Sequence, residues 1–279
     1  MAFKVPSLIG VIHLPALPGA PGSSRLSAEQ ALMQAGDWAV LEAKKLQSWG
    51  FDALILENFG DVPFYKSQVP PETIASLAIL ASAIRSAVSI PIGINVLRND
   101  ARAALAIAAV SGCDFIRVNV LSGVAATDQG MIEGEASFLL RERERLGASH
   151  VGILGDVHVK HAQSLSSHDI ALGVEEIALR AGADAVILTG STTGRPVNLQ
   201  ELQEASSLAK KHSIPVLLGS GVTSENWSQY QPYAQGVIVG SALRKNGKAG
   251  APLDQIRAKK FVQAFKLAKK AKKKPGRKK

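Results

Sequence analysis

The sequence of 279 residues has a single cysteine, Cys113, which excludes an internal disulfide framework and any metal site built from several cysteines. No apolar run approaches the roughly 20 residues that a membrane-spanning helix needs. The N-terminus enters an apolar run within a few residues and lacks the pattern of a signal or transit peptide. These absences predict a cytoplasmic protein of a reducing compartment, with peripheral membrane association left open.

Acidic residues are missing from the C-terminal end. Residues 259–279 contain 11 of the 32 Lys and Arg residues and no Asp or Glu. Residues 1–258 carry 21 basic and 23 acidic side chains, so the positive net charge comes from residues 259–279. We expect one globular domain over residues 1–268 and a disordered Lys/Arg-rich tail over 269–279. The tail could contact nucleic acid or an anionic membrane surface non-specifically, or act as a solubilising appendage.

Short apolar runs alternate with helical patterns along the body. The expected strands are residues 8–13, 53–57, 91–96, 115–120, a fifth strand within the stretch 152–161 that ends before Lys160, and then 185–188, 215–218 and 236–239. Eight strand–helix units in about 250 residues predict a single (β/α)₈ TIM barrel. A doubly wound open sheet is the competing architecture, but the Pro-containing segment after the first strand is a poor dinucleotide loop.

Polar side chains occur where the expected strands end, which is where active sites of (β/α)₈ barrels lie. Each one alone could be a loop cap, but burying the whole set is costly unless a ligand or network satisfies it. We expect the substrate-binding residues to be His13, Asn95, Arg117, Asn119, Thr189 and Asp128. Asp128 belongs to a long connection, residues 121–134, which could be a lid over the site or a solvated insertion.

The fifth strand carries the predicted acid–base chemistry. Its alternating pattern would place Asp156, His158 and Lys160 on one face. His158 is the expected general acid or base, with Asp156, Glu57 and Lys160 as catalytic partners. Lys160 could instead be a nucleophile or a phosphate ligand. A divalent metal held by Glu57, Asp156 and His158 is possible, although the spacing does not require one.

The last two strands are followed by glycine-containing loops. Backbone amides and a following helix N-terminus would favour an anion there, and this is the frequent phosphate site of (β/α)₈ barrels. The glycines could also simply make tight turns. The expected phosphate-binding residues are Gly219, Ser220, Gly221, Gly240 and Ser241.

Seven motifs together resemble those of the BtpA/SgcQ family, in order over roughly residues 7–257. They are IGVIHLPALPG (9–19), ENFGDVPF (57–64), NVLRND (95–100), RVNV (117–120), TDQG (127–130), DVHVKH (156–161) and GSGV (219–222). The resemblance implies a TIM barrel of the phosphate-binding type. It also implies either a phosphosugar enzyme or a factor for photosystem I accumulation at the thylakoid membrane. It supplies no catalytic residue set.

Two functions follow from these patterns. The favoured one is an enzyme of isomerase, epimerase or lyase type that acts on a phosphorylated, sugar-like small molecule and assembles as a homo-oligomer. The alternative is a non-catalytic biogenesis or stability factor for a membrane complex such as photosystem I. The number of polar strand ends favours the enzyme, because a scaffold does not need them.

Overall fold

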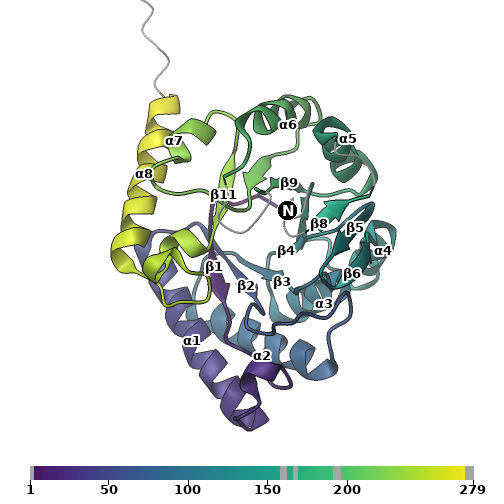
Figure 1. Cartoon of the computed structure of the whole chain (residues 1–279), viewed down its shortest axis with the longest axis vertical. Coiled ribbons are helices and arrows are strands. Elements are labelled where there is room, and N and C mark those ends of the chain that lie inside the picture. Colours follow the sequence, from purple (N-terminus) through teal and green to yellow (C-terminus); the bar gives the residue numbers. More distant parts are fainter. Residues whose placement is uncertain (1–2, 158–161, 166–168, 191–195, 274–279) are drawn as a thin grey trace, which may run out of the picture.

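The computed structural model describes residues 3–157, 162–165, 169–190 and 196–273 (Figure 1). Eight parallel strands form a closed barrel in the order β1-β11-β10-β9-β7-β4-β3-β2. The barrel strands are β1 Leu8–His13, β2 Ala53–Glu57, β3 Ile92–Asn95, β4 Phe115–Val118, β7 Gly152–Asp156, β9 Ala185–Leu188, β10 Val216–Leu218 and β11 Gly236–Val239. The predicted (β/α)₈ TIM barrel is confirmed.

Helices surround the barrel (Figure 1). They are α1 Ala28–Trp49, α2 Pro71–Ala87, α3 Ala101–Ser111, α4 Ala136–Arg145, α5 Ile170–Glu175 with a π-helical continuation over Glu176–Arg180, α6 Leu199–Lys211, α7 Trp227–Tyr230 and α8 Gln255–Lys273. Local signals set their ends: Ser27 and Gln30 form a capping box before α1, and Gly50 ends it in the left-handed region at φ 94°. No helix in the described part of the chain is long and apolar enough to cross a membrane.

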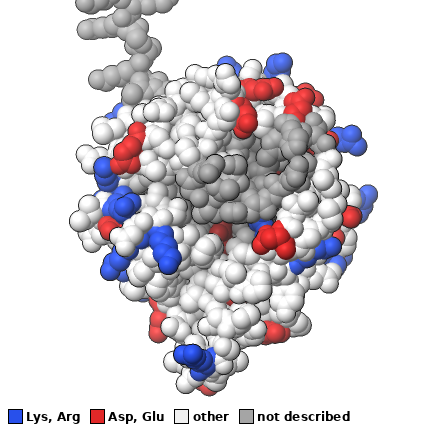
Figure 2. All heavy atoms as spheres, viewed as in Figure 1, with Lys and Arg blue, Asp and Glu red and all other residues white. Residues whose placement is uncertain are grey.

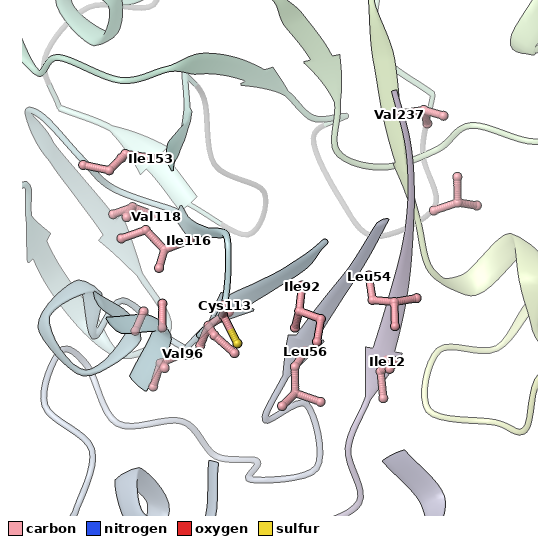
Figure 3. Packing of buried hydrophobic residues seen from close by; sticks show 14 of the residues in the cluster. Ile12, Leu54, Leu56, Ile92, Val96, Cys113, Ile116, Val118, Ile153 and Val237 are labelled. Carbon is pink, nitrogen blue, oxygen red and sulfur yellow. The ribbon is translucent and has the colours of Figure 1, made fainter. Parts of the chain in front are cut away.

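Two apolar layers hold the barrel together. The larger layer lies between strands and helices, and Figure 3 shows part of it, including Leu54, Ile116 and Ile153. The smaller layer fills the barrel interior with alternate strand residues such as Val11, Ile55 and Ile187. Because strand side chains alternate between faces, the next inward position on each strand is two residues further along. Those positions reach the C-terminal mouth of the barrel.

Residues 121–134 differ from the expected loop. They contain an antiparallel hairpin, β5 Val124–Thr127 and β6 Gly130–Glu133, and β8 Ala162–Ser164 pairs with β5. The resulting three-stranded sheet packs a small apolar cluster of Val120, Ala125 and Ile132. Strands of four residues separated by Asp128-Gln129 give too short an alternation to stand out in the sequence.

Three predicted boundaries differ by two residues or more, and strands β3 and β10 differ by one residue at an end. Strand β4 ends at Val118 rather than at residue 120, and strand β7 ends at Asp156, with residues 158–161 outside the described part of the chain. Helix α8 continues to Lys273, so residues 269–273, part of the predicted tail, belong to the helix. Ala and Lys are strong helix formers, and a run of them extends a helix that tertiary packing has already started.

Candidate functional site

A cavity of about 650 Å³ opens at the C-terminal ends of the strands. Its size is typical of a small-molecule site. Its polar and glycine lining comes from His13, Glu57, Asn95, Arg98, Arg117, Asn119, Asp128, Gln129, Gly219, Ser220, Gly221, Gly240 and Ser241. Its apolar lining includes Phe59, Phe64, Leu97, Val222 and Ala242. The residues predicted from strand ends therefore largely meet in one place.

The strand register explains why four of these side chains lie together. His13 pairs with Glu57 across β1 and β2, and Glu57 pairs with Asn95 across β2 and β3. The β3–β4 register, which pairs Ile94 with Ile116, puts Arg117 at the same level. In a parallel sheet, residues at one level on neighbouring strands point to the same face. All four point into the barrel mouth.

Arg117 and Asp156 form the electrostatic centre of the site. Arg117 donates from Nε to Asp156 Oδ1 at 2.9 Å and from Nη2 to Asp156 Oδ2 at 2.8 Å. Its Nη1 lies 3.6 Å from Glu57 Oε1. Burial alone would lower the pKa of Arg117, but the charges of Asp156 and Glu57 outweigh it and raise that pKa. The guanidinium is therefore a permanent cation held rigidly in place.

Two asparagine amides extend this centre. Asn119 Nδ2 donates to Asp156 Oδ2 at 3.3 Å, and Asn119 Oδ1 accepts from Asn95 Nδ2 at 3.1 Å. Asn95 Nδ2 also donates to the backbone carbonyl of Arg117 at 3.0 Å. The hydrogen bonds form a chain from Asp156 through Asn119 to Asn95, and each amide is held in one orientation.

His13 faces Glu57 from the neighbouring strand β1. Its Nδ1 accepts a hydrogen bond from the backbone N–H of Gly250 at 3.3 Å, which places the neutral ring's proton on Nε2. Nε2 lies 3.9 Å from Glu57 Oε2. The ring also packs against Phe59, with centroids 4.5 Å apart. Glu57 thus lies between an imidazole and a guanidinium.

Two glycines at the expected phosphate loops make room for these side chains. A Cβ on Gly219 would lie 2.6 Å from Ile187, 2.8 Å from Thr189 and 3.1 Å from Arg117 Nη2. A Cβ on Gly240 would lie 2.9 Å from the His13 ring. Both positions require glycine for packing, whether or not a ligand also approaches their backbone.

The expected helix N-termini after these loops are short. Helix α7 has only four residues and begins at Trp227, and the 3₁₀ turn after Gly240 spans three residues, Ser241–Leu243. Elements this short still leave the N–H groups of one turn, beside the loop amides and hydroxyls, for an anion. Binding of an anion at these loops stays a prediction.

The remaining predicted residues have different positions. Asp128 lines the cavity from the β5–β6 turn. Asp156 lies behind Arg117 and has no exposed side-chain surface. The Thr189 methyl group lies near Gly219, and this residue does not line the cavity. His158 and Lys160 lie outside the described residues.

Arg98 is the main cavity residue without a predicted role. It follows β3 in the NVLRND motif and is buried. Burial lowers the pKa of Arg98, the nearby carboxylates Asp156, Asp128 and Glu57 oppose that change, and Arg117 adds to it. The NVLRND motif places Arg98 just beyond the end of β3. Only the fold shows that this loop brings Arg98 to the cavity. The sequence does not predict Phe59 and Phe64 as cavity residues, because apolar loop residues do not indicate a site.

The described residues contain no group of three or more His, Cys, Asp and Glu side chains arranged to hold a metal ion. The metal site considered from the sequence included His158, which is outside that set. Glu57 and Asp156 each face Arg117, so a cation already occupies the space between them.

Solved structures share the fold at low identity. N-(5'-phosphoribosyl)anthranilate isomerase from Pyrococcus furiosus matches with a TM-score of 0.54 and 15% identity, covering 94% of this chain and 99% of that chain. A 3-hexulose-6-phosphate synthase matches with a TM-score of 0.53 and 17% identity, covering 92% and 99%. Similarity at this level shows the barrel fold alone.

Sequence relatives are much closer. An uncharacterized protein of Pyrococcus abyssi is 49% identical over 260 residues, covering 93% of this chain and 95% of the relative. The photosystem I biogenesis protein BtpA of Synechocystis is 44% identical over 258 residues, covering 92% and 87%. The BtpA family model matches residues 4–267. With agreement over nearly its whole length, the chain belongs to the BtpA family.

Proposed function

We propose that this protein is an enzyme that binds a phosphorylated, sugar-like small molecule in the barrel-mouth cavity and acts on it by acid–base chemistry. The reaction type would be that of an isomerase, epimerase or lyase. One observation carries the proposal: Arg117, Asp156, Asn119 and Asn95 form a buried, oriented polar array beside Glu57 at the wall of a cavity. Burying such an array is costly, and catalysis is a use that repays it.

The phosphate would bind at residues 219–221 and 240–241. These loops line the cavity, and Ser220 and Ser241 add hydroxyl groups to the backbone amides. Both solved structures reported above are named for phosphorylated compounds, and they share this barrel fold. In such barrels the loops after the last two strands frequently bind phosphate.

Glu57 is our first candidate for the group that moves the proton. It lines the cavity, and its two oxygens lie 3.6 Å from Arg117 Nη1 and 3.9 Å from His13 Nε2. Arg117 and Arg98 would stabilise negative charge that develops on the substrate when a carbon-bound proton leaves. Asp156 would act as a positioning residue, since Arg117 and Asn119 occupy its oxygens. His158 is the second candidate.

Binding can be tested by thermal shift with phosphorylated sugars and their unphosphorylated counterparts, with and without a divalent metal. A ligand that binds only the folded state raises the Tm. Ser241→Asp should remove the rise by repulsion, while Ser241→Asn, of the same shape but neutral, should keep most of it. A flat response across the panel would contradict the proposal.

Turnover, once a substrate is found, distinguishes the two proton-transfer candidates. Glu57→Gln should lower kcat by about 10²- to 10⁴-fold if Glu57 is the acid or base. His158→Ala gives the matched comparison and should abolish turnover only if His158 has that role. Unchanged activity in both variants would refute acid–base catalysis by either residue.

A non-catalytic assembly role is the second candidate. Its support is the name of the Synechocystis relative, a photosystem I biogenesis protein, together with the Lys-rich C-terminal end. On the face shown in Figure 2, acidic and basic side chains are interspersed around the rim, so the basic end is the more distinctive charged feature. Deleting residues 270–279 should abolish binding to anionic vesicles if the tail is a membrane or partner contact. Light scattering would also test the expected homo-oligomer.

A further inference from the structure

We infer that the side-chain carbonyl of Asn95 accepts a hydrogen bond from a substrate hydroxyl group and thereby selects hydroxylated over deoxygenated substrates. The inference rests on the proposed function, because it names the chemistry of the ligand in the same cavity. It assigns Asn95 as a specificity residue rather than as the acid or base.

The orientation of the Asn95 amide follows from its neighbours. Both oxygens of Asp156 accept hydrogen bonds from Arg117, so Asn119 presents its donor Nδ2 to Asp156 Oδ2. Asn119 Oδ1 then faces Asn95 and requires a donor, which is Asn95 Nδ2 at 3.1 Å. Turning the Asn95 amide over would set its oxygen against two acceptors, Asn119 Oδ1 and the Arg117 carbonyl. Asn95 Oδ1 is therefore the amide atom that these neighbours leave without a hydrogen bond.

That oxygen is buried and has no partner. Asn95 is 1% exposed, and no donor within the described residues reaches its Oδ1. A buried carbonyl without a donor is costly, and native structures rarely keep one without a reason. Asn95 lines the cavity, so the contents of the cavity are the natural source of a donor.

A neutral hydroxyl is the donor that a sugar-like ligand supplies. The cavity lining holds two guanidinium groups, Arg117 and Arg98, and two carboxylates, Glu57 and Asp128, so its charge is balanced and does not require a cationic donor. Glu57 lies beside Asn95 at the same strand level. A hydroxyl bound by Asn95 would therefore hold the adjacent substrate carbon close to the candidate acid or base.

The test begins with the wild-type protein. Affinities for inorganic phosphate, ribose 5-phosphate, glucose 6-phosphate and fructose 6-phosphate are measured by calorimetry, and then those for each monodeoxy analogue of the tightest sugar phosphate. Loss of one particular hydroxyl should weaken binding about tenfold or more, because the Asn95 carbonyl is then left unpaired. The 2-amino analogue of glucose 6-phosphate shows whether an amine can replace the hydroxyl, and tight binding through that amine would overturn the choice of a hydroxyl.

Asn95→Ala should remove the discrimination, binding the hydroxylated and the sensitive deoxy ligand within about twofold of each other. Asn99→Ala is the matched control: Asn99 is also buried, but both its amide atoms pair with the Val120 backbone at 2.8 and 3.0 Å. It should keep the discrimination even if its stability falls. If Asn95→Ala does not fold, the wild-type monodeoxy series alone decides.

The possible failures differ. If neither inorganic phosphate nor any sugar phosphate binds, the proposed function fails and this inference fails with it. If sugar phosphates bind but every monodeoxy analogue binds equally well, or Asn95→Ala keeps the discrimination, only the role of Asn95 is overturned.

Discussion

Arg117 binds both carboxylate oxygens of Asp156, at 2.9 and 2.8 Å, and thereby joins the ends of β4 and β7 inside the barrel. Both side chains are buried, so neither charge has water as an alternative partner. A buried ion pair stabilises a fold little more than apolar residues of the same shape would. Removing one partner, however, destabilises the fold strongly, because the other charge stays buried and unpaired. It also fixes Asn119 and, through it, Asn95.

Asp156→Asn should lower the free energy of unfolding by about 3–5 kcal/mol, because Arg117 loses its principal counter-charge in a buried site. Urea denaturation measures the change. Glu225→Gln is the control, since Glu225 pairs with Lys260 at 2.6 Å on the exposed surface, where such a pair is worth at most about 1 kcal/mol. If both substitutions lowered the free energy of unfolding equally, burial would not be the reason for the cost of losing Asp156.

Arg244, which does not line the cavity, should be equally sensitive. It is fully buried, donates twice to Glu42 at 2.9 Å, and also donates to the carbonyls of Val11 and Ala251. Arg244→Met should destabilise the protein by about 3–5 kcal/mol by leaving Glu42 uncompensated. The double variant Arg244→Met/Glu42→Leu should recover part of the loss. A double variant less stable than Arg244→Met would refute this explanation.

Cys113 should make stability fall in alkaline solution. Burial raises the pKa of its thiol to about 12, with Asp114 adding and Arg85 opposing. In the unfolded chain the thiol has its ordinary pKa of 9.0. Between pH 9 and about 12 the unfolded state therefore binds fewer protons than the folded state, and stability decreases as pH rises.

The size of this effect is at most about 1.4 kcal/mol per pH unit. Denaturation of wild type and Cys113→Ala from pH 8 to 11 isolates it, because other groups titrate in both proteins. As pH rises through that range, the free energy of unfolding of the wild type should fall relative to that of Cys113→Ala. The folded wild type should also resist thiol reagents at pH 8 and react once urea unfolds it.

Gly36→Ala should stabilise the protein by about 0.5–1 kcal/mol. Gly36 lies inside α1, and an added Cβ would meet Leu80 at 3.6 Å, an ordinary contact. Alanine gains helix propensity at no steric cost. Gly112→Ala is the control and should destabilise the protein. Gly112 ends α3 in the left-handed region at φ 65°, which alanine adopts only with strain. Thermal denaturation measures both.

The barrel and many of its element boundaries can be predicted from the amino-acid sequence alone. Strands β1, β2, β9 and β11 have the predicted ends, because the apolar runs are short and bounded by polar or glycine residues. Helix α1 begins after the Ser27 capping box and ends at Gly50, since local hydrogen bonding decides both ends. The family resemblance can also be seen in the sequence, because the seven motifs occur in the family's order along the chain.

The contacts that the polar strand ends make depend on the tertiary structure. The strand pattern predicts Asp156 as a catalytic partner of His158, and in the fold Arg117 from another strand donates to both its oxygens. Arg98 and the β5–β6 turn reach the cavity through loop paths that no periodicity encodes. The glycines at 219 and 240 leave space for Arg117 and His13, which lie more than 100 residues away in the chain. Alternation along a strand predicts which way a side chain points, but its partner depends on register and closure of the barrel.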